Sequence, residues 1–262
     1  MQNESNSIPK IIHYCWFGNN PLPELAQKCI SSWEKFFPDY EIKEWNEQNY
    51  DVNKILYTKQ AYETKKYAFV SDYARFDILY QYGGLYFDTD VEVIKDLHSI
   101  IECGAFIGVE KGQKSLLNAG LGIASPVASL IYAEILESYQ KENFINQDGS
   151  YNLKTVVERV TDIFKKHGFI EEDKKQYIAD TIIYPSEYFC PKDPDTGLVT
   201  LTENSYMIHH YDGSWLSKGM KKLYQEKQWL AMHVKFIPLR WVLEKIFVVK
   251  KVILSIFLIR NK

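Results

Sequence analysis

The sequence is short of cysteine and of long apolar runs, and each shortage excludes a class of protein. Its 262 residues include four cysteines, at positions 15, 29, 103 and 190, and no two of them form a C-x-x-C pair. This spacing supports neither a zinc ribbon nor a dense disulfide framework. The longest uncharged stretch near the C-terminus, residues 252–259, is far shorter than the roughly 20 residues of a membrane-spanning helix. The polar opening lacks the apolar core of a secretory signal, so we expect a cytoplasmic protein.

Charge is distributed unevenly along the chain. Residues 216–262 carry eleven basic and two acidic residues, whereas the remainder carries 20 basic and 32 acidic ones. We therefore expect a main domain at 1–216 and a basic, apolar helical tail at 217–262. One interpretation places this tail on an anionic membrane surface, at the inner face of the plasma membrane. The other docks it as a helix on the body or on a partner. No nucleic-acid partner is expected.

The first 45 residues predict a βαβ unit. Residues 10–17 form a continuous apolar run, typical of a strand buried on both faces in a parallel sheet. A helical pattern follows over 24–37, and a second strand pattern over 40–45. This order is typical of a nucleotide-binding α/β domain. Further patterns predict helices at 65–82, 126–139 and 153–166, and strands at 85–94, 105–109, 120–124, 178–184 and 205–210.

Two carboxylates stand one residue apart in the predicted strand at 85–94. If Asp88 and Asp90 lie in a strand, they project to the same side, about 6.5 to 7 Å apart along the chain. Burying two carboxylates is costly unless they are paired or bind a metal. Oxygen ligands suit Mg²⁺ or Mn²⁺, so a divalent cation site is one interpretation. An acidic pair in a turn is the other.

A second polar pair lies upstream, on the predicted helix at 65–82. Asp72 and Arg75 are three residues apart and therefore share a face. Ala68 and Leu79 lie near that face, which indicates that the pair does not point straight into water. The functional interpretation is a clamp that holds hydroxyl groups of a bound sugar. The structural alternative is an ion pair on the helix surface, which contributes little stability.

The run from Ser71 to Asp90, SDYARFDILYQYGGLYFDTD, resembles the signature of glycosyltransferases that contain the DxD sugar-binding region. These include bacterial capsule and O-antigen enzymes, yeast mannosyltransferases and, more distantly, the glucosylating domains of clostridial toxins. The chain keeps every fixed position of S-D-x-x-R-x-x-x-L-x-x-x-G-G-x-Y-x-D-x-D, and the looser resemblance covers about residues 8–216. It implies a GT-A-type fold, a nucleotide-sugar donor, a divalent metal and retention of anomeric configuration.

The resemblance also implies roles for residues outside that run. Trp16 matches a tryptophan that packs on uracil, and Asn118 matches an asparagine near the donor sugar, although a turn residue needs no such role. H-x-x-G-x-W from His210 is similar to the metal-binding end of related retaining enzymes. We therefore expect His210 to join Asp88 and Asp90 at the metal, with His209 as the alternative. Trp215 either closes over the diphosphate or is a core residue.

Together these features predict transfer of a hexose from a UDP-sugar to a glycan acceptor. Mn²⁺, or Mg²⁺, would stabilise the departing diphosphate as a Lewis acid. The basic tail favours an acceptor carried on polyprenyl diphosphate, the setting of O-antigen and capsule synthesis. The rival hypotheses are a metal-dependent phosphatase or nucleotide-sugar hydrolase, and a noncatalytic sugar-binding subunit.

Overall fold

The computed structural model describes residues 7–112, 114–213, 218–233, 246–247 and 250. These residues fall into two compact units. Unit 1 lies within Met1–Pro191 and Leu201–His210, and unit 2 lies within Lys192–Thr200 and Tyr211–Lys262. The domain boundary predicted between residues 216 and 217 falls outside the described residues.

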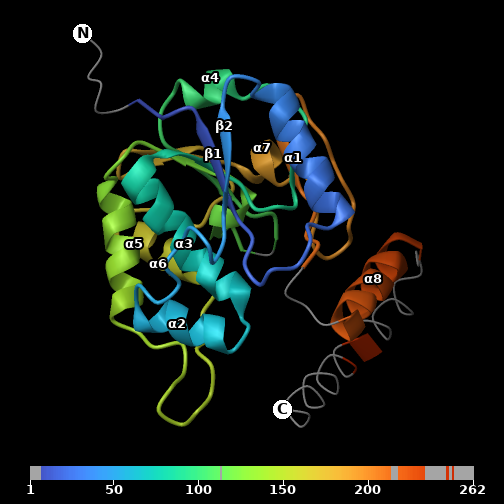
Figure 1. The fold of residues 1–262 in the computed structure, drawn as a ribbon. Coiled ribbons are helices and arrows are strands. Elements are labelled where there is room, and N and C mark those ends of the chain that lie inside the picture. The colour runs from blue at the N-terminus through green and yellow to red at the C-terminus, as the bar shows by residue number, and fades with distance from the viewer. Residues whose placement is uncertain (1–6, 113, 214–217, 234–245, 248–249, 251–262) are drawn as a thin grey trace. The chain divides into compact units, whose positions relative to one another are not determined.

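The secondary structure alternates between strands and helices along most of unit 1 (Figure 1). The strands are β1 (Ile11–Cys15), β2 (Glu41–Trp45), β3 (Gly84–Tyr86), β4 (Val91–Val93), β5 (Phe106–Val109), β6 (Leu117–Asn118), β7 (Ile123–Ser125), β8 (Gln176–Ile178), β9 (Thr181–Tyr184) and β10 (Met207–His209). The helices are α1 (Glu24–Phe36), α2 (Leu56–Glu63), α3 (Tyr67–Tyr82), α4 (His98–Ile101), α5 (Leu130–Gln140), α6 (Val156–Lys166), α7 (Ser186–Phe189) and α8 (Lys218–His233).

A mixed sheet forms the centre of unit 1. Its strands follow the order β2-β1-β3-β7-β5-β9-β8, and β6 pairs with β5. β1 runs parallel to β2 and to β3, as the βαβ prediction requires, whereas β7 is antiparallel to both β3 and β5. A separate two-stranded sheet pairs β4 with β10. The predicted α/β class, with a mixed sheet flanked by helices, is confirmed.

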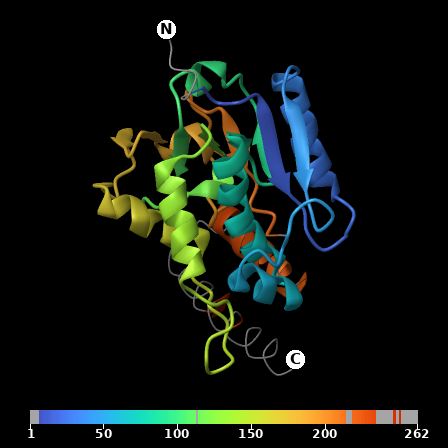
Figure 2. The same cartoon turned by 60° about the vertical axis from the view of Figure 1, so that its left-hand side comes forward.

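The two faces of the large sheet pack against different helices (Figure 2). Because neighbouring strand residues point to opposite faces, Cys15 joins the core beneath α3 while Tyr14 packs against Trp33 of α1, with ring centroids 5.7 Å apart. On the other half of the sheet, Ile107 joins the same core as Cys15, and Phe106 packs on Phe189 of α7. Both faces of the central strands are therefore buried, which explains why their sequences read as continuous apolar runs.

The continuous strand predicted at 85–94 is wrong. β3 ends at Tyr86 and belongs to the large sheet, whereas β4 begins at Val91 and belongs to the small one. Asp88 and Asp90 lie in the turn between them, where the amide of Val91 donates to the carbonyl of Asp88 at 3.0 Å. Every residue of β3 is buried, whereas β4 buries Val91 and Val93 and leaves Glu92 partly exposed. The apolar pattern therefore continues on both sides of the turn and hides the break between the strands.

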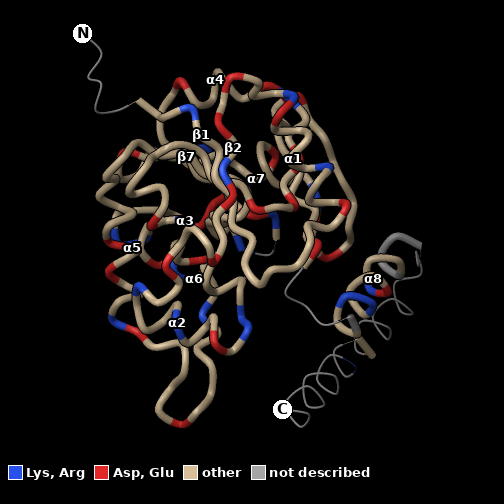
Figure 3. The backbone as a smooth tube through the Cα atoms, viewed as in Figure 1, with Lys and Arg blue, Asp and Glu red and all other residues tan. Residues whose placement is uncertain are grey.

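Unit 2 contains α8, whose basic residues stand out in Figure 3. Met220 and Leu223 of this helix pack with Phe247. Lys221 pairs with Asp212 at 2.8 Å, and Lys227 pairs with Asp195. In the part of the chain that the structure describes, no helix is both long enough and apolar enough to cross a membrane.

His13 is a buried histidine that the sheet holds in its neutral form. Its Nε2 lies 2.9 Å from the carbonyl oxygen of Gly83, and its Nδ1 accepts from the indole N–H of Trp45 at 3.1 Å. Nδ1 must therefore be unprotonated while Nε2 carries the proton. Burial lowers the pKa of His13 from 6.5 to about 4.

This pKa predicts a loss of stability in mild acid. The unfolded chain protonates His13 near pH 6.5, whereas the folded chain does not until about pH 4. The stabilisation is complete above pH 6.5 and disappears as the pH falls towards 4, for a total of about 3 kcal/mol. Denaturant titrations at pH 7 and pH 4.5 should show a smaller loss for His13→Gln, whose amide can both donate and accept. An equal loss in the two proteins would contradict the prediction.

Candidate functional site

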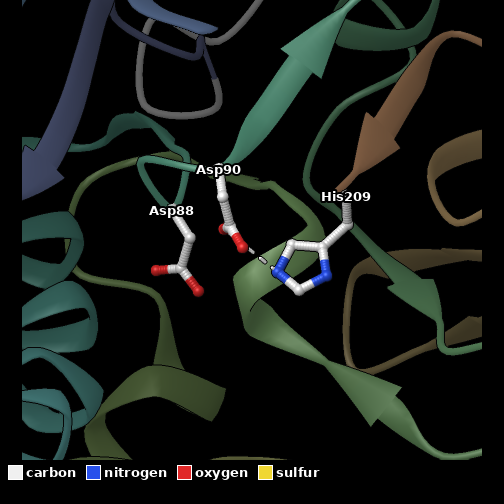
Figure 4. Close-up of side chains that lie close together, drawn as sticks. All are labelled: Asp88, Asp90 and His209. Carbon is white, nitrogen blue, oxygen red and sulfur yellow. Dashed lines mark ion pairs between the residues drawn. The ribbon is translucent and has the colours of Figure 1, made fainter. Parts of the chain in front are cut away.

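The site is built around the turn between β3 and β4, where two aspartates approach a histidine from β10 (Figure 4). Ligand atoms of Asp88, Asp90 and His209 all lie within 4.8 Å of one another. The turn makes this possible, because carboxylates separated along an extended strand would stand farther apart. In β10, His209 pairs with Val91, so the antiparallel register brings the histidine directly beside the turn.

Arg75 connects this turn to helix α3. Its guanidinium donates to Asp72 at 2.8 Å and lies 3.3 Å from Asp88, and it stacks over the ring of Tyr86 at 4.9 Å from the centroid. The hydroxyl of Tyr86 also donates to Asp88, at 3.1 Å. The arginine side chain is only 4% exposed. Asp72 and Arg75 therefore form a buried pair that joins the site, not an isolated ion pair on the helix surface.

Burial and charge act against each other in this cluster. Burial raises the pKa of Asp72 to about 6, although the adjacent Arg75 opposes the shift. For Arg75, burial would lower the pKa, but Asp88, Tyr86 and Asp72 together raise it above its usual value. The guanidinium is therefore permanently charged, and at pH 7 the Asp72 carboxyl is mainly ionised. The Asp72 side chain is 14% exposed and the Asp88 side chain is 28% exposed, so Asp88 is the more accessible of the two.

The sequence favoured His210 as the third metal ligand, and here the structure differs. Nε2 of His209 lies 3.2 Å from a carboxylate oxygen of Asp90. His210 instead places its Nε2 2.8 Å from Glu92, while its backbone amide donates to the carbonyl of Asp90. Adjacent residues at a strand end point in different directions, so only one histidine meets the aspartates, and it is His209. Burial alone would lower the pKa of His209, but Asp90 raises it above its usual value.

His210 belongs to a neighbouring polar chain. Glu92 accepts from both His210 and Lys28 of α1, the latter at 2.9 Å. Burial would raise the pKa of Glu92, but these two hydrogen bonds lower it below its usual value. Through Glu92, these contacts connect the residue after β10 to β4 and to α1.

Asn118 and Gly120 lie next to the turn, and Gly120 limits the space around the Asp88 carboxylate. The side-chain oxygen of Asn118 accepts from the amide of Gly120 at 2.7 Å, and its nitrogen donates to Glu110 at 3.0 Å. A Cβ atom on Gly120 would lie 2.3 Å from a carboxylate oxygen of Asp88. Glycine is thus required here so that the backbone can approach the carboxylate. The sequence singled out Asn118 as a candidate but not Gly120, since nothing in the pattern indicates that this glycine contacts Asp88.

The structure describes one of the two tryptophans that the sequence places at the donor site. Trp16 is half-buried in the loop that follows β1, and its indole N–H donates to the carbonyl of Asn20 at 2.6 Å. This loop leaves the carboxyl end of a parallel strand, which is where α/β sheets bind ligands. Trp215 lies outside the described residues.

Two carboxylates and one imidazole fit a divalent cation. Mg²⁺ takes oxygen ligands and usually keeps sites for water and substrate phosphate, whereas an imidazole in the set suits Mn²⁺ better. The proximity of the three side chains and the partial exposure of Asp88 leave room for further ligands from a substrate. Arg75 forms salt bridges to both Asp72 and Asp88, and so connects Asp72 to the three candidate metal ligands. Asp72 and Arg75 are therefore positioned to contact the same substrate.

Comparison with known proteins identifies the segment that contains most of this site. Residues 23–106 match the family model of the glycosyltransferase sugar-binding region containing the DXD motif. The resemblance inferred from Ser71 to Asp90 is confirmed by this match. The match includes Asp72, Arg75 and both aspartates of the turn, whereas Trp16 and His209 lie outside it.

The relatives by sequence are also glycosyltransferases. The chain is 31% identical over 113 residues to inositol phosphoceramide mannosyltransferase 3 of Schizosaccharomyces pombe, covering 40% of this chain and 30% of the relative. Inositol phosphoceramide mannosyltransferase 1 of the same yeast is 28% identical over 115 residues, which is 40% of this chain and 34% of the relative. The chain thus spans about a third of the length of these two relatives. An uncharacterized glycosyltransferase of Acanthamoeba polyphaga mimivirus is 24% identical over 79% of this chain and 84% of its own length.

Among solved structures, the PaToxG glycosyltransferase aligns with a TM-score of 0.46 and 17% identity, covering 62% of this chain and 70% of that one. The galactosyltransferase LgtC, solved with donor and acceptor sugar analogs, aligns with a TM-score of 0.43 and 12% identity, covering 88% and 98%.

The two histidines provide a matched test of the cation site. We expect His209→Ala to weaken Mn²⁺ binding at least tenfold, because it removes an imidazole from the set. His210→Ala removes an adjacent imidazole of the same size and should change the affinity less than threefold. Titration of each folded variant with Mn²⁺, followed by electron paramagnetic resonance, measures both. A larger effect at His210 would contradict the geometric assignment.

Proposed function

We propose that this protein is a metal-dependent glycosyltransferase of the GT-A type that transfers a hexose from a nucleotide diphosphate sugar to a glycan acceptor. The observation that supports this most is the convergence of Asp88, Asp90 and His209 beside the buried Arg75. That cluster lies in a chain that carries the sugar-binding region of glycosyltransferases.

Each side chain of the cluster has a defined part in the proposed reaction. Asp88, Asp90 and His209 would hold Mn²⁺ or Mg²⁺, which, when bound, supplies positive charge that stabilises the departing diphosphate. Asp72 is suited to accept hydrogen bonds from sugar hydroxyls, because it is ionised at neutral pH and partly exposed. Arg75 holds Asp72 and Asp88 at a fixed spacing, so the sugar and the diphosphate are aligned relative to each other.

We propose UDP as the nucleotide and retention as the stereochemical outcome. Trp16, at the carboxyl end of β1, offers a partly exposed aromatic ring on which a base can stack. The two yeast relatives are named as mannosyltransferases, so a guanosine diphosphate sugar is the alternative to test beside UDP-sugars. Product analysis by NMR distinguishes retention from inversion through the configuration of the new anomeric bond.

The aspartate of the turn provides the central test. Asp90→Asn removes the charge but keeps the shape, so we expect transfer to fall at least a hundredfold while the melting temperature changes little. Chelation with EDTA should likewise abolish activity, and Mn²⁺ should restore it. Donor consumption with and without a glycan acceptor separates a transferase from a nucleotide-sugar hydrolase. Full turnover by Asp90→Asn in saturating Mn²⁺ would disprove the metal assignment.

For the acceptor, we propose a saccharide carried on a lipid, such as polyprenyl diphosphate in O-antigen or capsule synthesis, at the inner face of the plasma membrane. The yeast relatives are named for a ceramide lipid. In unit 2, Trp229 is 56% exposed and Ile246 is 45% exposed, and α8 is rich in lysine. Exposed aromatic and basic side chains on one helix are typical of binding at an anionic lipid surface.

Vesicle binding by the full-length chain tests this location. We expect sedimentation with phosphatidylserine vesicles that weakens as salt rises, because charge attraction is screened. Lys222→Gln combined with Trp229→Ser should reduce binding about fivefold or more, since one basic residue near the surface contributes about 1 kcal/mol. Lys141→Gln serves as the control, because Lys141 is an exposed lysine directly after α5 in unit 1. An intact chain that ignores anionic vesicles at low salt would disprove the membrane proposal.

A further inference from the structure

The loop that carries Trp16 is held by the carboxylate of Glu47, which lies just after strand β2. Oε1 of Glu47 accepts from the backbone amide of Gly18 and, at 3.0 Å, from the hydroxyl of Tyr62. The other oxygen, Oε2, is buried, and the described residues offer it no hydrogen-bond partner. Both donors therefore converge on one oxygen, and each would lose its partner if the carboxylate were removed.

The conformation of the loop depends on this contact. Gly18 has φ +100° and Asn19 has φ +53°, so two consecutive residues occupy the left-handed region. A Cβ atom on Gly18 would lie 2.4 Å from the ring of Tyr67, which shows that the ring packs directly on bare backbone. The rings of Tyr62 and Tyr67 are themselves in contact, with centroids 5.4 Å apart. We call Gly18, Glu47, Tyr62 and Tyr67 the loop anchor.

The loop anchor joins the two halves of the proposed donor site. Tyr67 is the first residue of α3, the helix that carries Asp72 and Arg75 one to two turns later. Trp16 is held at two points: its amide donates to the carbonyl of Trp45, the last residue of β2, at 2.8 Å, and its indole donates to the carbonyl of Asn20 in its own loop. Gly18 lies between Trp16 and Asn20 in the chain, so the anchor at Gly18 helps set the position of the indole relative to α3.

We propose that Glu47 is a positioning residue for the nucleotide: it holds the Trp16 loop in the conformation that binds the base of a nucleoside diphosphate, without touching the donor. This inference rests on the proposed function, because it assumes that Trp16 stacks on the base. Its chemical requirement is one acceptor oxygen at Oε1, not a negative charge, because both donors of the contact are neutral.

That requirement allows a matched pair of variants. Glu47→Gln keeps an acceptor oxygen and the shape of the side chain, so UDP affinity should stay within about threefold of wild type. Glu47→Leu has a similar size but no acceptor, and UDP affinity should fall about tenfold. Trp16→Ala is the reference, since loss of a stacked base costs about 1 to 3 kcal/mol, or roughly ten- to a hundredfold. UDP and GDP are titrated by calorimetry in the presence of Mn²⁺.

Two further measurements separate positioning from general destabilisation. Mn²⁺ affinity without nucleotide, and the rate of donor hydrolysis at saturating donor, should both change less than twofold in Glu47→Leu. Tyr62→Phe removes one of the two donors and should weaken UDP binding about two- to fivefold. If Glu47→Leu does not fold, Tyr62→Phe decides the matter, and unchanged UDP affinity in that variant overturns the inference.

The outcomes also separate this inference from the proposed function. If the wild-type chain binds neither UDP nor GDP, the proposed function is disproved, and the proposed role of Glu47 is disproved with it. A wild-type chain that binds nucleotide, loses affinity in Trp16→Ala and keeps it in Glu47→Leu overturns the inference alone.

Discussion

The candidate site depends on one buried charged side chain, the guanidinium of Arg75. Arg75 lies inside unit 1 and contacts two carboxylates that come from different elements, Asp72 on its own helix and Asp88 on the turn after β3. A buried guanidinium is tolerated only when its charge and its hydrogen bonds are satisfied, so both carboxylates must stay near it. This requirement fixes the position of the turn relative to α3. It also fixes how the carboxylates of Asp72 and Asp88 are oriented around Arg75.

The passage of the chain from one sheet to the other explains why a turn stands where a strand was expected. The chain leaves the large sheet after Tyr86 and enters the small sheet at Val91, with a turn closed by the hydrogen bond from Val91 to Asp88 between them. The indole of Trp33 in α1 donates to the carbonyl of Val91 at 2.8 Å, which helps fix the start of β4. A polar turn held between two short, buried strands brings carboxylates closer together than a single extended strand would, and His209 reaches them across the small sheet.

Much of the architecture could be predicted from local pattern. The βαβ opening, the helix from Tyr67 to Tyr82 and the parallel pairing of β1 with β2 all follow from apolar periodicity and from the glycines that end the helix. Shorter elements such as α2, α4 and α7 were not predicted, because four to eight residues carry too little periodicity to stand out. Asp72, Arg75, Asp88 and Asp90 were identified from their spacing and from the motif that it forms.

The sequence alone determined which residue types the site contains and that Asp72 and Arg75 share a helix face, because i,i+3 spacing is a local property of a helix. Only the tertiary structure decided that His209 and not His210 faces Asp90, since that choice depends on the register of β10 against β4, two strands that are more than a hundred residues apart in the chain. The contacts of Gly120 with Asp88 and of Glu47 with Gly18 were decided in the same way. Each of these two contacts joins segments that are distant in the sequence and meet only because whole strands and helices pack together. The residue spacing within a single segment therefore cannot predict the contact.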